Sequence, residues 1–153
     1  MEDFMLPVKV LFLDLGDTLV KKGGGARYDW VEGAKAILPQ LKTHQVRMGI
    51  LSNTGTLTRS ELLAIMPADF DLSFFEDDLI ILSNEVGVEK PHLAIFTYAI
   101  KRAAIDPKHC VFCTESLRDV LACQLVGMRA AWVLTGQVGE FANELIDSRL
   151  LPI

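Results

Sequence analysis

The sequence has little of what nucleic-acid binding, membrane insertion or a disulfide framework requires. Its 15 basic residues are outnumbered by 20 acidic ones, which gives a net charge of −5 and a pI near 5.1. A protein that follows a phosphate backbone instead needs a basic face. No apolar run approaches the ~20 residues that span a bilayer. The three cysteines are an odd number, which does not suit a disulfide framework. Residues 1–4 include two acidic residues where a signal peptide carries positive charge. We therefore expect a cytoplasmic protein without nucleic-acid or membrane partners.

The composition is that of a folded globular protein. Hydrophobic residues make up 50% of the 153 positions and charged residues 23%, which excludes disordered and low-complexity chains. A chain of this length forms about one domain and can build a core without disulfides or metals. Since no internal repeat or linker interrupts the sequence, we predict a single domain over residues 1–153.

Short apolar runs alternate with amphipathic stretches along the chain. The predicted strands are residues 8–13, 46–51, 79–82, 110–113 and 130–134. The predicted helices are residues 29–43, 56–65, 91–104, 117–125 and 138–146. Because parallel strands need crossover connections, this alternation predicts an α/β fold with a five-stranded, Rossmann-like parallel sheet in a three-layer α/β/α sandwich. Residues 21–25 are glycine-rich but are not followed by Gly-Lys-Ser/Thr, so we predict a surface loop.

Polar side chains follow the predicted strands where their carboxyl ends meet, which is where open α/β sheets bind ligands. Asp14 ends the first strand, Ser52 the second, and Lys90 follows the third. Glu115 and Asp119 follow the fourth. Carboxylates suit a divalent cation, and an ammonium and a hydroxyl suit phosphate oxygens, so this edge could hold both together.

Four segments, in order, resemble the motifs of the haloacid dehalogenase-like hydrolase superfamily, most of whose members are magnesium-dependent phosphatases. Each segment alone is a weak signal, whereas four at sensible spacing over nearly the whole chain are a strong one. The resemblance implies the strand order 5-4-1-2-3, which would place Asp14 beside Glu115. The segments are residues 11–19 (LFLDLGDTL), 49–53 (GILSN), 87–91 (GVEKP) with Ile95 and Phe96, and Glu115 and Asp119 followed by Val120, Ala122, Gly127 and Met128.

The resemblance implies hydrolysis of a phosphate monoester, on a phosphorylated small molecule or macromolecule, through an aspartyl-phosphate intermediate. Asp14 would be the nucleophile. Ser52 would donate a hydrogen bond to the phosphate, Lys90 would neutralise its charge, and Asn53 would help to bind it. The implied cofactor is Mg²⁺, a hard cation that prefers oxygen ligands. Its implied ligands are Asp14, the backbone carbonyl of Gly16, Glu115 and Asp119.

The sequence departs from the family pattern at two positions. Gly16 stands where family phosphatases carry a second Asp as general acid and base, a loss that typically costs ~10²–10⁴-fold in rate. Asp17 is one residue further, but neighbouring side chains of an extended chain point to opposite sides. Thr114-Glu115 replaces the usual Gly-Asp, and the longer Glu fits the strict geometry of Mg²⁺ less well.

The chain also lacks room for a large cap domain. Residues 15–51 and 53–89 are accounted for by core helices and one strand. An uncapped site does not exclude water by itself. It would therefore take a bulky or macromolecular substrate, or borrow a lid from another subunit, and the apolar composition is compatible with a homo-oligomer.

Two other functions share part of this pattern of residues. Gly16 and Glu115 leave open a catalytically impaired family member that binds a phosphate-bearing ligand or a protein as a regulatory module. A receiver-type signalling domain is disfavoured, because Ser83-Asn84 follows the third strand where its phosphorylated Asp would stand. Cys110 and Cys113 fall within a predicted strand, so we predict core residues rather than a redox or zinc pair.

Overall fold

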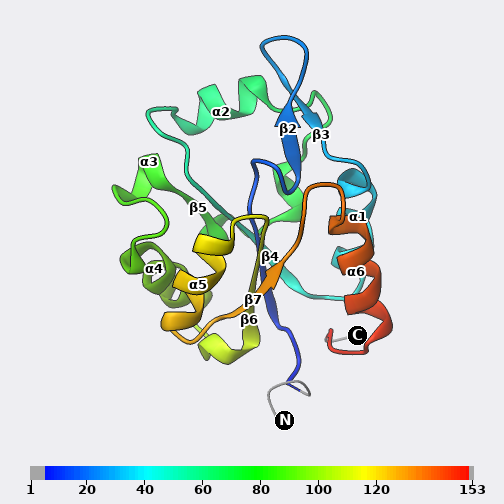
Figure 1. The fold of residues 1–153 in the computed structure, drawn as a ribbon, viewed down its shortest axis with the longest axis vertical. Helices are drawn as coiled ribbons and strands as arrows, with labels where there is room; N and C mark the ends of the chain where they lie inside the picture. The colour runs from blue at the N-terminus through cyan, green and yellow to red at the C-terminus, as the bar shows by residue number, and fades with distance from the viewer. Residues whose placement is uncertain (1–5, 152–153) are drawn as a thin grey trace.

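The computed structural model describes residues 6–151, which form a parallel sheet between two layers of helices (Figure 1). The sheet has five strands in the order β5-β4-β1-β6-β7. Counted along the chain, this is the order that the family resemblance implies, and the predicted five-stranded α/β fold is confirmed. The strands are β1 (Val10–Leu13), β4 (Arg47–Ser52), β5 (Ile80–Leu82), β6 (Cys110–Thr114) and β7 (Arg129–Trp132).

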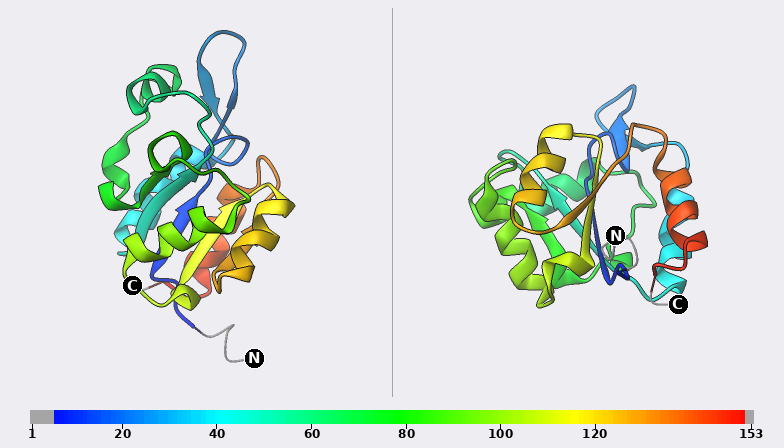
Figure 2. Two further views of the ribbon diagram at one scale, coloured as in Figure 1. Left: turned by 90° about the vertical axis from the view of Figure 1, so that its left-hand side faces the viewer. Right: turned by 60° about the horizontal axis from the view of Figure 1, so that its bottom comes forward.

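The central strand β1 shows why the strand segments read as continuous apolar runs: all four of its residues are buried. Leu11 and Leu13 belong to the core on one face of the sheet, while Val10 and Phe12 belong to the core on the other. The first core is covered by α1 (Ala34–Thr43) and α6 (Val138–Asp147), the second by α4 (Leu93–Ala103) and α5 (Leu117–Leu125) (Figure 2).

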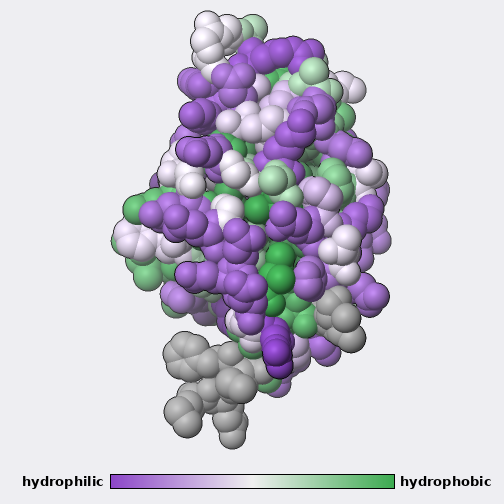
Figure 3. Space-filling model, turned by 90° about the vertical axis from the view of Figure 1, so that its right-hand side faces the viewer, coloured by the Kyte–Doolittle hydropathy of each residue, from purple (hydrophilic) through white to green (hydrophobic). Residues whose placement is uncertain are grey.

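The outer surface is consistent with helices that bury only one face. The side of the molecule that carries α1 and α6 is mostly hydrophilic on its outside (Figure 3). Within residues 6–151, none of the helices combines the length and apolar content that crossing a membrane demands.

A β-hairpin at the carboxyl end of the sheet was not predicted. Its strands are β2 (Val20–Lys22) and β3 (Tyr28–Trp30), so the predicted loop at residues 21–25 lies partly in β2. The predicted helix 29–43 begins only at Ala34, after Gly33 with a φ of 81°. Trp30 has the spacing of the following helix in the sequence, but it lies in β3. Its ring stacks on Phe70, with the ring centroids 5.4 Å apart.

Two helices begin later than predicted because capping side chains mark their true starts. α2 (Arg59–Ile65) follows Thr58, whose hydroxyl accepts a hydrogen bond from the Glu61 amide in a capping box. α4 follows His92, so the proline at position 91 precedes the helix rather than beginning it. The other short elements were too short for a periodic signal: α3 (Ser83–Val86), η2 (Leu72–Phe74), η3 (Asp77–Leu79) and η4 (Pro107–His109).

Candidate active site

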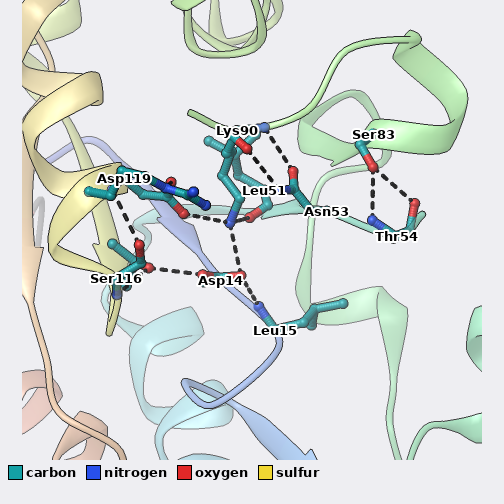
Figure 4. A network of polar contacts seen from close by, with 11 residues as sticks. Asp14, Leu15, Leu51, Asn53, Thr54, Ser83, Lys90, Ser116 and Asp119 are labelled. Carbon is teal, nitrogen blue, oxygen red and sulfur yellow. Dashed lines mark hydrogen bonds and ion pairs between the residues drawn. The ribbon is translucent and has the colours of Figure 1, made fainter. Parts of the chain in front are cut away.

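Three charged side chains meet at the carboxyl edge of the sheet (Figure 4). Asp14 directly follows β1, Asp119 lies in the first turn of α5, and Lys90 comes from the segment between α3 and α4. The Lys90 Nζ atom lies 3.0 Å from Asp14 Oδ1 and 3.4 Å from Asp119 Oδ2, and it donates a hydrogen bond of 3.1 Å to the Leu51 carbonyl. The three residues are only 4–6% exposed. All three ammonium protons of Lys90 thus have oxygen partners.

The site holds more negative charge than Lys90 neutralises. Burial raises the pKa of Asp14 above its usual value, and the Lys90 charge, the Thr114 hydroxyl and the Leu15 amide lower it only in part. Burial also raises the pKa of Glu115, and the charge of Asp14 raises it further. Two buried carboxylates on one ammonium, with a third carboxylate nearby, create a potential that attracts a cation.

Thr114 contacts the predicted nucleophile directly, a role that sequence reasoning missed. The Thr114 hydroxyl donates a hydrogen bond of 2.8 Å to Asp14 Oδ2 and accepts one of 3.1 Å from the Ser116 amide. The Leu15 amide donates to Asp14 Oδ1 at 2.8 Å. Both carboxylate oxygens are therefore held. Oδ1 accepts from Leu15 and Lys90, whereas Oδ2 accepts only from Thr114 within the described residues and keeps a free lone pair. A hydroxyl at the end of β6, in place of the family's glycine, was the signal for this contact.

Asn53 holds the backbone of Lys90. Its Nδ2 donates to the Lys90 carbonyl at 2.9 Å, and its Oδ1 accepts from the Lys90 amide at 2.8 Å. This paired contact fixes the segment that brings Lys90 into the site, and the predicted contact of Asn53 with substrate stays a prediction. Ser52 ends β4, is buried, and shares the wall of one pocket with Gly16.

Position 16 carries no side chain, and the next residue does not replace it. A Cβ placed on Gly16 would have no neighbour within 4 Å. Asp17 is exposed and has a φ of 63°, so the assumption of an extended backbone at this position is wrong. The chain turns sharply here, with the Asp17 amide donating to the Val20 carbonyl at 2.7 Å. The described structure thus supplies no acid in the place of the family's second Asp.

The predicted Mg²⁺ ligands are oxygen atoms, which suit that ion, but their side chains are not grouped around a common point in this structure. In residues 6–151, no three His, Cys, Asp or Glu side chains are grouped closely enough to hold a metal ion, and Lys90 Nζ lies between Asp14 and Asp119. However, Asp119 Oδ1 is buried without a hydrogen bond, and the Arg118 Nε atom is 3.9 Å away. An unsatisfied buried carboxylate oxygen next to surplus negative charge suits a hard cation.

The chain matches known proteins in sequence. The family model of haloacid dehalogenase-like hydrolase matches residues 18–133. A glyceraldehyde 3-phosphate phosphatase from Pyrococcus abyssi is 30% identical over 108 residues, which cover 70% of this chain and 43% of that protein. A glyceraldehyde 3-phosphate phosphatase from Methanothermobacter thermautotrophicus is 32% identical over 117 residues, or 76% of this chain and 49% of that protein. The chain thus spans about half the length of the curated relatives it matches.

Solved structures share the fold. A HAD-superfamily hydrolase from Ehrlichia chaffeensis has a TM-score of 0.70 at 16% identity, covering 93% of this chain and 99% of that one. A HAD family enzyme from Bacteroides thetaiotaomicron, in complex with magnesium and inorganic phosphate, has a TM-score of 0.64 at 16% identity, covering 84% of this chain and 95% of that one.

Proposed function

The chain belongs to the haloacid dehalogenase-like hydrolase family, and on this basis we propose that it hydrolyses a phosphate monoester through Asp14. The buried contact of Asp14 with Lys90 at the carboxyl edge of the sheet is the observation that carries this proposal. Relatives that are themselves phosphatases support a phosphorylated substrate.

The first half-reaction transfers the phosphoryl group to Asp14. The free lone pair of Asp14 Oδ2 attacks phosphorus, the new O–P bond forms, and the bond to the leaving oxygen breaks. Ser52 donates a hydrogen bond to a phosphoryl oxygen, and Lys90 balances the charge of the group. Because residue 16 is glycine, the leaving oxygen takes its proton from water. The first half-reaction therefore favours leaving groups that are stable as anions.

The second half-reaction returns Asp14 to its carboxylate form. Water attacks the phosphorus atom, the bond to Asp14 breaks, inorganic phosphate leaves, and the water proton passes to solvent. Lys90 and Thr114 receive the carboxylate in its original position, since they contact its two oxygens in the resting structure.

We propose Mg²⁺ as the cofactor, held by Asp14, Glu115, Asp119 and the backbone carbonyl of Gly16. When bound, Mg²⁺ neutralises charge on the phosphoryl group. Two observations support this assignment. A cation would give the unsatisfied Asp119 oxygen a partner, and it would offset the burial and the neighbouring negative charge that raise the pKa of Glu115.

The proposal is tested by trapping the aspartyl phosphate. Purified protein is incubated with Mg²⁺ and acetyl phosphate, a phosphoryl donor whose leaving group needs no acid. Mass spectrometry then locates the adduct, while phosphate release is followed over time. We expect an adduct on Asp14 and its loss in Asp14→Asn. Phosphate release that persists in Asp14→Asn would refute the mechanism.

The absence of a side chain at position 16 favours one second function, a binding module with little turnover. The same experiment separates the two. An adduct that forms and is then hydrolysed identifies a phosphatase, whereas an adduct that persists shows a working nucleophile whose second half-reaction is slow. No adduct at any Mg²⁺ concentration would favour the binding module.

A further inference from the structure

The outer side of α5 carries a stripe of exposed leucines. Leu117, Leu121 and Leu125 are 48%, 57% and 76% exposed, and their spacing of four residues aligns them along one side of the helix. Trp132 of the neighbouring strand β7 is 54% exposed (Figure 1). Its Nε1 atom donates a hydrogen bond of 2.8 Å to the Glu115 carbonyl, so it extends the stripe at the N-terminal end of α5. We call Leu117, Leu121, Leu125 and Trp132 the α5 surface.

The fold alone does not require this stripe. The buried residues of α5 are Asp119, Val120, Ala122 and Cys123. A helix with one buried face usually carries polar residues on its outer side. The helix α6 does so, since its exposed residues are Glu140, Asn143, Glu144 and Asp147. On α5, by contrast, three of the five exposed residues are leucines. An exposed apolar patch of this kind is typical of a contact with another protein.

The charges of α5 favour an antiparallel copy of the same helix as that protein. Of the five exposed residues of α5, only Arg118 is charged. It lies in the first turn, where the positive end of the helix dipole disfavours a cation. The last turn, at the negative end, has no basic residue. When two copies of α5 pack antiparallel, each Arg118 lies beside the C-terminal end of the other helix, and both mismatches are removed.

The exposed residues also match one another in that arrangement. With a two-fold axis at Leu121, this leucine faces the same residue of the second copy, and Leu117 faces Leu125. Arg118 then faces Gln124, whose amide oxygen accepts hydrogen bonds from a guanidinium group. Leucines therefore meet leucines along the centre of the contact, while a donor meets an acceptor at each end.

The free edge of the sheet is a less suitable place for a second copy. β7 is an edge strand, and Glu140 and Glu144 line the groove between it and α6. If the β7 strands of two copies paired, the α6 helices would meet as well, and these carboxylates would face their own counterparts. Like charges placed opposite each other disfavour a contact. Charge therefore favours contact through the α5 surface.

We propose that the α5 surface binds a second copy of this chain, in an antiparallel two-fold contact centred on Leu121. The proposal does not depend on the phosphatase function. Since α5 has nine residues, it is only about 13 Å long. Its contact with a second α5 and with Trp132 is smaller than the roughly 800 Å² per partner of a typical stable interface. We therefore expect a reversible dimer with a Kd in the micromolar range.

Sedimentation velocity from about 1 to about 500 μM, a range that brackets such a Kd, tests whether the dimer exists. Leu121→Arg places two like charges at the two-fold axis, and we expect it to raise the Kd at least about 100-fold. The matched control is Leu63→Arg, at an exposed leucine of α2, which should leave the Kd unchanged. A wild-type protein that stays monomeric throughout, or a dimer that Leu121→Arg does not weaken, would overturn the proposal.

Two variants of Gln124 separate the contact from effects on folding. Gln124→Glu gives each Arg118 a carboxylate on the second copy, so the Kd should fall about 10-fold for the two contacts together. Within its own helix, however, an acid in the last turn is unfavourable. Gln124→Lys should raise the Kd about 10-fold, although a base in the last turn suits its own helix. Kd values that do not change in these opposite directions would contradict the antiparallel contact.

Cross-linking tests the direction of the two helices. The three natural cysteines are buried, so a cysteine introduced on α5 is the one that a short bis-maleimide reaches first. We expect Leu121→Cys to cross-link with itself, and Leu117→Cys to cross-link with Leu125→Cys when the two proteins are mixed. Leu117→Cys alone should cross-link poorly, because eight residues along a helix separate the two ends of the stripe by about 12 Å. Efficient cross-linking of Leu117→Cys with itself would show parallel helices and refute the proposal.

Discussion

Replacing Gly16 by Asp should accelerate the phosphate-monoester hydrolysis that we propose. The structure has room for the change, because a Cβ at this position meets nothing within 4 Å and the backbone does not lie in the left-handed region. The new carboxyl group would stand two residues after Asp14, in the wall of a pocket that Ser52 also lines. It could therefore protonate the leaving oxygen in the first half-reaction and take a proton from water in the second.

The expected gain follows from the work of one general acid and base. Such a group contributes about 10²–10⁴-fold, or about 3–5 kcal/mol of activation free energy at about 1.4 kcal/mol per tenfold. The gain should depend on the leaving group. An alkyl ester such as glycerol phosphate needs a proton on its leaving oxygen, so both half-reactions gain. Acetyl phosphate releases a stable anion, so only the hydrolysis of the aspartyl phosphate gains.

The assay compares Gly16→Asp with Gly16→Asn, which has the same size but cannot transfer a proton. Single-turnover formation and decay of the adduct separate the two half-reactions for each donor. We expect the Asp variant to accelerate decay with both donors and formation with glycerol phosphate only. Equal rates in the Asp and Asn variants would refute the assignment of position 16 as the missing acid and base.

Further predictions concern the buried charges, the nucleophile and the thiols. Lys90→Met leaves buried Asp14 without a cation and buried Asp119 with only Arg118, whose Nε atom is 3.9 Å away. It should lower the free energy of unfolding by about 3–5 kcal/mol, measured by urea denaturation, against about 1 kcal/mol or less for the exposed Lys108→Met. Thr114→Val removes a hydrogen bond to a charged group and should slow adduct formation about 10–100-fold, with recovery in Thr114→Ser. Because burial raises the pKa of Asp14, the folded state keeps a proton that the unfolded state releases. With metal removed, the advantage of wild type over Asp14→Asn in unfolding free energy should therefore fall as pH rises from 3.8 through the raised pKa. Burial raises the pKa of Cys113 to about 12, so it should resist alkylation in the native state and react after unfolding.

Much of the fold could be predicted because the parallel strands are buried on both faces. Such strands read as unbroken apolar runs, as β1 does, and their alternation with helices determines a sheet with crossovers. The hairpin could not be predicted in the same way. Lys21 and Lys22 of β2 are exposed, and Trp30 of β3 has the spacing of the following helix. Its actual partners, Phe70 and Asp69, are distant in sequence and become neighbours only in the folded chain.

The sequence allowed the charged residues of the site to be placed together, because each follows a strand of the same sheet. A carboxylate oxygen of Asp14 and one of Asp119 both lie within 3.4 Å of Lys90 Nζ. The hydrogen bonds around them are a different matter. Asn53 lies next to Ser52 and could have faced the substrate, but its amide holds the Lys90 backbone. Whether the Asn53 side chain faces the substrate or the Lys90 backbone depends on the tertiary packing, and spacing along the chain does not reveal that packing.

The two departures from the family pattern act on different parts of the reaction. Thr114 adds a donor to Asp14 Oδ2, which fixes the carboxylate for attack and leaves one lone pair free. Gly16 removes the group that would transfer protons. In the proposed mechanism, attack on a donor with a stable leaving anion therefore needs no acid at position 16, whereas hydrolysis of the aspartyl phosphate proceeds without a general base and is slowed by its absence. We expect phosphorylated Asp14 to accumulate for that reason. The ratio of the rate of adduct formation to the rate of adduct hydrolysis then sets the fraction of phosphorylated Asp14, and the slower of the two rates is set by how fast water attacks without help at position 16.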